Sequence, residues 1–295
     1  MMIRILLIGK NGQLGWEFQR TLSSLGDLTA VDWPEIDFSH PETVRDLVRT
    51  VRPHLIVNAA AYTAVDKAEN EIDLASAINA AAPAILAEEA LALPAALIHF
   101  STDYVFDGLK GSAYIESDPP HPLNRYGQTK LEGEQAIQNL GGAFWTLRTS
   151  WVYSLRRDSF VTKVLEWSRH QKTLRIVHDQ FGCPTWCRLL AEITTLALAQ
   201  GRRDPVGWVH QTAGLYHLAG AGFTNRFEWA QEILKLDPHP EEQLVESVTS
   251  STSTEFPTPA QRPLYVPLNC DRFTETFDLR LLPWQEALRL LMTLA

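Results

Sequence analysis

A tyrosine and a lysine four positions apart are the residues of this sequence best suited to chemistry. Tyr126 and Lys130 lie in the run Tyr-Gly-Gln-Thr-Lys at the start of a predicted helix, so their side chains share one helical face. A tyrosine can donate a proton to a developing alkoxide, and a cationic lysine is expected to lower its pKa by stabilising the phenolate. This pair occurs by chance in many proteins, so the prediction needs further residues.

Thr102 provides the first support for this pair. It stands just past the end of a predicted strand, residues 96–101, where its hydroxyl can hydrogen-bond the same substrate oxygen as Tyr126. The three residues are suited to reducing a ketone, because hydride transfer needs a proton donor and hydrogen-bond donors at the carbonyl oxygen.

A glycine-rich loop near the start of the chain provides the second support. Gly9, Gly12 and Gly15 form a GxxGxxG motif between a predicted strand and a predicted helix. The first glycine permits a tight turn, the second lets the backbone approach a pyrophosphate at the helix N-terminus, and the third permits close packing of helix and strand. The loop predicts a dinucleotide cofactor, NADPH or NADH.

The choice between the two cofactors stays open on the sequence. Asp32 ends the second predicted strand, 17 residues after Gly15, where a carboxylate can accept a hydrogen bond from a ribose hydroxyl of NADH. Lys10, inside the glycine loop, can instead neutralise the 2′-phosphate of NADPH.

Alternating strands and helices position these residues. Five apolar runs are predicted strands, and amphipathic helices separate them: strands at 3–8, 28–32, 54–59, 96–101 and 143–150, helices at 13–25, 41–51, 76–93 and 127–140. This β-α-β repetition predicts an α/β fold, a Rossmann-type doubly wound parallel sheet.

The second half is less regular and predicts a smaller α+β region. Its predicted elements are helices near 160–169, 188–200 and 225–236 and from 284, strands at 173–177 and 215–218, and an exposed loop at 248–259. We expect residues 1–155 to form the NAD(P)-binding domain. Residues 156–295 are expected to form a C-terminal substrate-binding region that is partly intertwined with the first domain.

Composition excludes several classes of protein. The chain of 295 residues has 26 Lys+Arg against 35 Asp+Glu, which argues against nucleic acid as a partner. Its three cysteines are too few for a disulfide framework, and they have no zinc-ligand spacing. We identify no apolar run that approaches the roughly 18 residues of a membrane span, and we do not expect the start to be a signal peptide. We therefore expect a cytoplasmic protein with no membrane partner.

Motifs along nearly the whole chain carry a resemblance to a known family. They are residues 9–17, 57–69, 101–108, 122–130, 148–153, 179–185, 214–218 and 262–263. On these residues the chain resembles the extended short-chain dehydrogenase/reductases and, among them, the reductases of 4-keto nucleotide sugars. The resemblance implies NAD(P)H-dependent reduction of the C4 ketone of dTDP-4-dehydro-L-rhamnose to dTDP-L-rhamnose.

The resemblance also implies roles for individual residues. Thr102, Tyr126 and Lys130 match the catalytic positions. Cofactor contacts are expected from Gly9, Gly12, Gln13, Leu14, Gly15, Asp32, Asp37, Phe38, Ala59, Ala60, Ala61, Tyr126 and Lys130. Substrate contacts are expected from Thr102, Asp103, Tyr126, Trp151 and Arg262.

A few further residues are candidates for binding or structure. Arg262 and Lys163 are candidates for the substrate diphosphate, because cations bind phosphate oxygens. Trp151 and Tyr153 are predicted either to contact the sugar or to pack between the two regions. His99 and His217 lie in predicted strands, and we interpret both as structural.

Some relatives carry a magnesium ion bridged by glutamates at a dimer interface. Glu17 matches one of those ligands, but Arg188 and Gln285 stand where the other two are expected. The prediction is therefore no metal site, with Mg²⁺ left as an alternative, and a monomer or a homodimer.

Three alternative functions share part of this residue pattern. A 4,6-dehydratase of this fold needs a glutamate after the aspartate that follows its threonine, and here Asp103 is followed by Tyr104. The only argument against a nucleotide-sugar epimerase is that this chain matches the reductase motifs closely. A non-catalytic regulatory subunit, like that of methionine adenosyltransferase, is disfavoured because Thr102, Tyr126 and Lys130 are all present.

Overall fold

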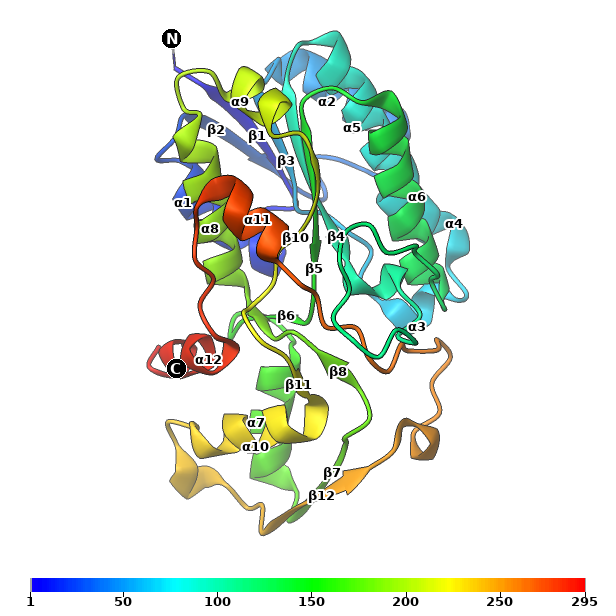
Figure 1. The fold of residues 1–295 in the computed structure, drawn as a ribbon, viewed down its shortest axis with the longest axis vertical. Helices are drawn as coiled ribbons and strands as arrows, with labels where there is room; N and C mark the ends of the chain where they lie inside the picture. The colour runs from blue at the N-terminus through cyan, green and yellow to red at the C-terminus, as the bar shows by residue number, and fades with distance from the viewer. Residues whose placement is uncertain (1, 295) are drawn as a thin grey trace.

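A six-stranded parallel sheet forms the larger half of the computed structural model, which describes residues 2–294 (Figure 1). Its order is β10-β5-β4-β3-β1-β2, and every neighbouring pair is parallel. The strands are β1 (Arg4–Ile8), β2 (Asp27–Val31), β3 (Leu55–Asn58), β4 (Ala96–Thr102), β5 (Phe144–Thr149) and β10 (Gly214–His217). The order reverses between β1 and β3, which is the switch point of a doubly wound sheet. The predicted fold class is confirmed.

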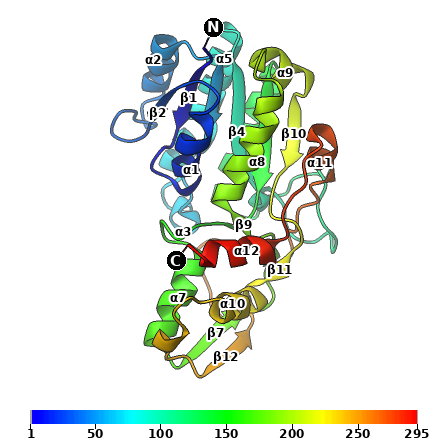
Figure 2. The ribbon, with the colours of Figure 1, turned by 90° about the vertical axis from the view of Figure 1, so that its left-hand side faces the viewer.

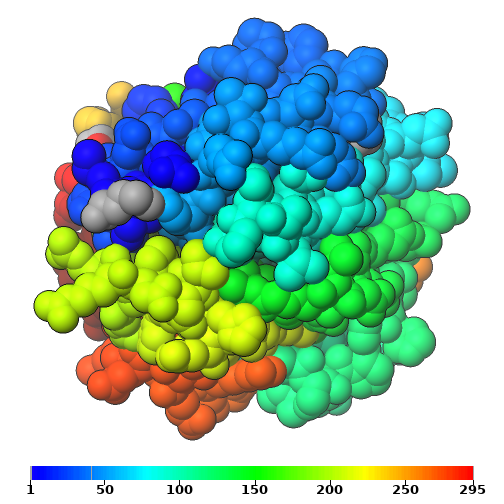
Figure 3. All heavy atoms as spheres, turned by 90° about the horizontal axis from the view of Figure 1, so that it is seen from above, coloured from blue at the N-terminus to red at the C-terminus, as the bar shows by residue number. Residues whose placement is uncertain are grey.

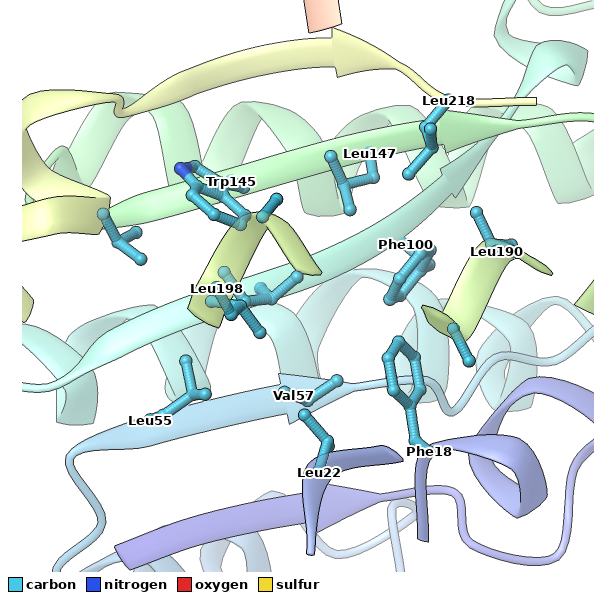
Figure 4. Close-up of a cluster of buried hydrophobic side chains, with 14 of the residues drawn as sticks. Phe18, Leu22, Leu55, Val57, Phe100, Trp145, Leu147, Leu190, Leu198 and Leu218 are labelled. Atoms are coloured by element: carbon cyan, nitrogen blue, oxygen red, sulfur yellow. The ribbon is translucent and has the colours of Figure 1, made fainter. Parts of the chain in front are cut away.

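Helices cover both faces of this sheet. One face packs against α1 (Gln13–Leu22) and α8 (Cys187–Gln200), and Figure 4 shows Phe18 and Leu22 from α1 and Leu190 and Leu198 from α8 meeting side chains of β3, β4 and β5. The other face packs against α2 (Pro41–Val51), α5 (Ala82–Ala92) and α6 (Arg125–Leu140). Because both faces are covered, the inner strands are continuous apolar runs rather than alternating ones.

A smaller lobe lies beyond the carboxyl ends of the strands (Figure 2). It contains α7 (Phe160–His170), β7 (Thr173–Val177), β8 (Phe181–Gly182), β11 (Thr224–Asn225), α10 (Arg226–Lys235), β12 (Ser247–Ser251) and α12 (Trp284–Met292). Strand β12 pairs in parallel with β7. The prediction of an exposed loop at 248–259 is therefore wrong for its first four residues, where valine, threonine and serine satisfy their backbone groups in a two-stranded ladder.

The chain returns from the small lobe to the sheet half more than once. Helix α8, α9 (Pro205–Gln211), β10 and α11 (Asp271–Phe277) all lie with the sheet. In Figure 3 the segments near residues 200 and 275 lie on the same face as the first 150 residues. The division at residue 155 remains a proposal, and residues 187–217 and 271–277 belong spatially with the sheet.

The remaining elements connect these parts. They are α3 (Val65–Ala68), α4 (Ile72–Ser76), a π-helical turn η1 (Ala77–Ala81), the 3₁₀ turns η2 (Asp103–Val105), η3 (Pro240–Glu242) and η4 (Ser253–Glu255), and the paired strands β6 (Val152–Tyr153) and β9 (Thr185–Trp186). The three cysteines are free thiols, and Cys183 and Cys187 are buried.

One helical stretch is long and apolar enough to cross a membrane by length and composition alone. It runs over Ile72–Ala92 through α4, η1 and α5, so the expectation that no run approaches this length is wrong. Half of its most apolar window is buried inside the protein, and Ala82 and Leu86 pack in the core beside the sheet. Core helices of globular domains pass the same test.

Candidate active site

A cleft of about 1030 Å³ opens at the carboxyl ends of the parallel strands. This is the place where doubly wound sheets bind ligands, because the loops that follow the strands diverge there. Most of the predicted cofactor and substrate residues line it: Gly9, Gly12, Gln13, Leu14, Asp32, Asp37, Phe38, Ala59, Ala60, Ala61, Thr102, Asp103, Tyr126, Lys130 and Trp151.

The glycine loop has the geometry that its sequence predicts. Gly9 has a φ of +91°, and a Cβ on it would lie 2.7 Å from the backbone nitrogen of Ala60. A Cβ on Gly15 would lie 1.9 Å from the carbonyl oxygen of Gly9, so Gly15 permits close packing of α1 on the loop. It is not among the described residues that line the cleft. Gly12 caps α1 without a side chain, which leaves the first N–H groups of the helix open to an anion.

Asp32 and Asp37 follow the second strand, β2, and the nearby Lys10 forms an ion pair with Glu35. Asp32 accepts hydrogen bonds from the backbone N–H groups of Asn11 at 2.9 Å and Trp33 at 2.8 Å. Lys10 lies 2.5 Å from the carboxylate of Glu35 and holds the pKa of that carboxyl below its usual range. Asp37 also lines the cleft, and hydrogen bonds from Ser39 lower its pKa. Lys10, the candidate partner for the 2′-phosphate of NADPH, is thus already paired with Glu35.

Substituting Asp32→Ala should move cofactor preference toward NADPH. Removing one like charge from the neighbourhood of a 2′-phosphate is worth at least about 1 kcal/mol, so the ratio of kcat/KM for NADPH to that for NADH should rise at least about fivefold. Glu35→Gln should move the ratio the same way, because it releases Lys10. An unchanged ratio in the Asp32→Ala variant would show that Asp32 does not lie at the ribose.

The start of α6 brings Tyr126 to the end of β4. The Asn124 side chain accepts a hydrogen bond from the Gly127 N–H at 2.8 Å and so caps the helix. A Cβ on Gly127 would lie 2.2 Å from the carbonyl oxygen of Tyr104, so only glycine lets α6 approach η2 this closely. The rings of Tyr104 and Tyr126 meet edge to face with centroids 5.8 Å apart.

Lys130 is fully buried beneath the cleft. Its ammonium donates a hydrogen bond to the Phe100 carbonyl oxygen at 2.6 Å and lies 3.2 Å from Nε2 of His99. Burial lowers the pKa of Lys130 to about 8, with the charge of Glu134 acting in the opposite direction. His99 therefore borders the lysine, a contact that its place in a buried strand could not reveal. His217 lies buried between the carbonyl oxygens of Tyr114 and Asn269, as a structural residue should.

The pKa of Tyr126 does not shift in the direction we expected. Burial raises it, and the nearby Thr102 hydroxyl only moderates the effect. Lys130 directs its ammonium to Phe100 and His99, so the expected lowering by the lysine is not seen. A neutral phenol at neutral pH is the proton-donating form.

A buried hydrogen-bond network surrounds Thr102. Its hydroxyl donates to one carboxylate oxygen of Asp103 at 3.0 Å and accepts from the Tyr104 N–H at 3.2 Å. Ser150 donates to the other oxygen of Asp103 at 2.6 Å and accepts from the Cys183 N–H. Burial raises the pKa of Asp103 to about 6, although both hydroxyl groups and the charge of Arg226 lower it.

Asp103 should make stability depend on pH. Its folded pKa lies about 2 units above the usual value, so the native protein binds this proton more tightly than the unfolded chain. Stability from this group is present at low pH and falls as pH rises from about 4 to 6, by about 3 kcal/mol in all. Asp103→Asn should therefore raise the free energy of unfolding at pH 8 but barely at pH 4.

The measurement is urea unfolding of both proteins at the two pH values. Asp37→Asn serves as the control, because the pKa of Asp37 is lowered and its pH trend should have the opposite sign. A free energy change for Asp103→Asn that is the same at pH 4 and pH 8 would contradict the role assigned to the carboxylate.

Trp151 lies at the border between the sheet and the small lobe. It has a φ of +41°, and its ring stacks on Trp229 with centroids 5.4 Å apart. A Cβ on Gly182 would lie 2.5 Å from that ring, so the glycine makes room for it. Tyr153, by contrast, is buried in the core of the small lobe, which favours packing over sugar contact.

Arg262 and Lys163, the two residues suggested by the sequence as ligands of the substrate diphosphate, are not among the described residues that line the cleft. The Arg262 guanidinium pairs with the carboxylate of Asp66 at 2.7 Å and also donates to Thr258. Lys163 lies on the exposed side of α7. Arg157 and Asp158 do line the cleft, and no motif in the loop that carries them identifies them from the sequence.

The implied magnesium site does not fit the residues present. The Arg188 guanidinium lies 3.3 Å from the carboxylate of Glu17, so a cation of the chain itself neutralises the matching ligand. Gln285 is exposed on α12. Within residues 2–294 no group of three or more metal-ligating side chains gathers.

Removal of divalent metal ions should change neither the activity nor the stability of this protein. We expect turnover and melting temperature to be unchanged after EDTA treatment and dialysis, since the Arg188–Glu17 ion pair occupies the place of the metal. Loss of turnover that magnesium alone restores would contradict this.

Comparison with known proteins agrees with the geometry. The model of the family described as RmlD substrate binding domain matches residues 3–294. The dTDP-4-dehydrorhamnose reductase of Escherichia coli strain K12 is 41% identical over 288 residues, 96% of this chain and 95% of the relative. That of Burkholderia thailandensis is 38% identical over 291 residues, covering 98% of this chain and 97% of the relative.

Solved structures give the same picture. A dTDP-4-dehydrorhamnose reductase from Bacillus anthracis, solved in complex with NADP, superposes with a TM-score of 0.88 at 30% identity and covers 100% of both chains. One from Clostridium acetobutylicum superposes with a TM-score of 0.88 at 33% identity over 99% of both chains. The match of the family model to nearly the whole chain, together with the identity and coverage of these relatives, leads to one conclusion: the chain belongs to the dTDP-4-dehydrorhamnose reductase family of NAD(P)H-dependent oxidoreductases.

Proposed function

We propose that this enzyme reduces the C4 ketone of dTDP-4-dehydro-L-rhamnose to dTDP-L-rhamnose. The observation that supports this most directly is the convergence of Thr102, Tyr126 and Lys130 on the cleft that also contains the glycine loop. The open N–H groups at the start of α1 and the small side chains of Ala59, Ala60 and Ala61 fit the diphosphate and flat rings of NADH or NADPH. When bound, this cofactor supplies the hydride.

Tyr126 is the proton donor in this proposal. As hydride reaches C4, negative charge develops on the ketone oxygen, and a phenol beside that oxygen can neutralise it. The raised pKa of Tyr126 keeps the phenol protonated at neutral pH, which suits reduction rather than oxidation.

Thr102 and Asp103 orient the reacting oxygen. A hydroxyl has a single hydrogen, and that of Thr102 is donated to Asp103 while the carboxylate is ionised. When Asp103 carries a proton, it can donate to Thr102, whose own hydrogen then turns to the ketone. Thr102 is therefore expected to bind the ketone oxygen best when Asp103 is neutral.

Lys130 is assigned to the nicotinamide ribose and to charge compensation. Its pKa of about 8 leaves it mostly cationic at neutral pH, so it places a positive charge at the floor of the cleft, where the ribose is expected. The Phe100 carbonyl fixes its position below the cleft, beside His99.

An assay of nicotinamide oxidation with dTDP-4-dehydro-L-rhamnose tests the proposal. A reductase oxidises one NADH or NADPH for each sugar reduced. An epimerase would isomerise the sugar without net oxidation of added cofactor, and a regulatory subunit would show no turnover with either cofactor.

A cytoplasmic location and a monomeric or homodimeric state remain predictions from the sequence.

A further inference from the structure

Arg226, the first residue of α10, lies on a shelf of aromatic rings at the border of the cleft. Its guanidinium carbon is 3.7 Å from the ring centroid of Trp151, 4.7 Å from that of Phe160 and 5.4 Å from that of Trp229. Arg226 is not among the described residues that line the cleft, but Trp151, over whose ring it lies, is one of them, so the guanidinium lies at the border of the cleft. The charge of Asp103, another lining residue, acts on it.

This guanidinium has no anionic partner in the protein. Within residues 2–294 its side chain forms neither an ion pair nor a hydrogen bond, whereas the neighbouring Arg262 is engaged by Asp66, Thr258 and the Ala260 carbonyl. Burial lowers the pKa of Arg226 to about 10, with Tyr104 and Asp103 opposing the effect. A desolvated cation without a partner is unfavourable, and an anionic ligand would relieve that state.

We infer that Arg226 binds the diphosphate of the nucleotide-sugar substrate, in the role that the sequence suggested for Arg262. The inference rests on the proposed function, which supplies a substrate with a diphosphate. A guanidinium presents parallel N–H donors that match phosphate oxygens, and stacking on Trp151 fixes the plane of the fork. Because Arg226 belongs to the small lobe and Asp103 to the sheet half, the substrate would bridge the two.

The test measures binding of dTDP by calorimetry and of thymidine by ligand-observed NMR. Arg226→Met keeps an unbranched stem over Trp151 but removes the charge. We expect its Kd for dTDP to rise roughly 10- to 100-fold, the effect of losing a charge-assisted hydrogen bond. Its Kd values for thymidine and NADPH should not change. Arg226→Lys should recover part of the dTDP affinity, because it restores a point charge without the fork.

Arg175→Met is the matched control, because Arg175 also stacks on an aromatic ring, that of Phe256, but on the exposed surface of the small lobe. It should bind dTDP like the unmodified protein. Equal dTDP affinity of Arg226→Met and the unmodified protein, or an equal loss for thymidine, would overturn the assignment of Arg226 alone. Failure of the unmodified protein to bind dTDP would overturn both this assignment and the proposed substrate.

Discussion

Tyr126→Phe is expected to lower kcat by about 10²–10⁴-fold, the usual contribution of general acid catalysis. The substitution keeps the ring and its edge-to-face contact with Tyr104 but removes the hydroxyl that faces Thr102. No other phenol lines the cleft within residues 2–294, so no neighbouring group of that kind replaces it. The Kd for NADH or NADPH should barely change, because Lys130 is the expected ribose contact. Steady-state kinetics and cofactor titration measure both quantities.

Tyr153→Phe is the control for this experiment. Tyr153 is also buried with a raised pKa, but it lies in the core of the small lobe and its hydroxyl has no hydrogen-bond partner among residues 2–294. Its kcat should match that of the unmodified enzyme. A Tyr126→Phe enzyme with nearly unchanged kcat would end the proposed mechanism, and a regulatory role would then be favoured.

Glu134→Gln is expected to have the largest effect on stability, a loss of about 3–5 kcal/mol in the free energy of unfolding. Glu134 on α6 and Arg148 on β5 form a bidentate ion pair with N–O distances of 2.7 and 2.9 Å, and their side chains are only 1% and 3% exposed. Removing the carboxylate leaves the guanidinium buried without compensation. Urea unfolding at pH 7 measures the change.

Two further variants separate charge burial from loss of packing. Glu134→Leu combined with Arg148→Met should recover most of the lost stability, because no charge then remains buried. Glu192→Gln removes the partner of Arg20 in a half-exposed pair and should change stability by less than about 1 kcal/mol. If Glu134→Gln cost no more than Glu192→Gln, the buried pair would not be a major source of stability.

The Glu134 variant also affects the site. Because the charge of Glu134 raises the pKa of Lys130, its removal should lower that pKa further below its usual value. The buried pair thus links the stability of α6 to the charge state of the lysine four residues before it.

Features that depend on residues close together in sequence were predictable. The close approach of Gly9 and Gly15 follows from three glycines between a strand and a helix, and the shared face of Tyr126 and Lys130 follows from their spacing. The parallel sheet follows from apolar runs separated by helices. In each case the physical requirement acts within one turn, one helix or one β-α-β unit.

Features that depend on which side chains meet across the fold were not predictable. Lys10 pairs with Glu35 across 25 positions, and Arg262 pairs with Asp66 across 196. Both pairings redirect a cation that the sequence made a candidate for phosphate binding. The raised pKa of Tyr126 comes from burial created by distant segments, so a spacing rule for tyrosine and lysine cannot supply it.

The repeated passage of the chain between the two halves limits how this protein can evolve. The sheet half takes its edge strand β10 from residues 214–217, and the core of the small lobe combines Tyr153, Trp229 and Leu288. A single recombination event near residue 155 would therefore divide both cores and replace parts of each. A protein with this topology therefore cannot exchange its substrate specificity by domain shuffling. New specificity must instead arise by point substitution of residues at the border of the cleft, such as the proposed diphosphate ligand Arg226, because a single substitution leaves the path of the chain unchanged.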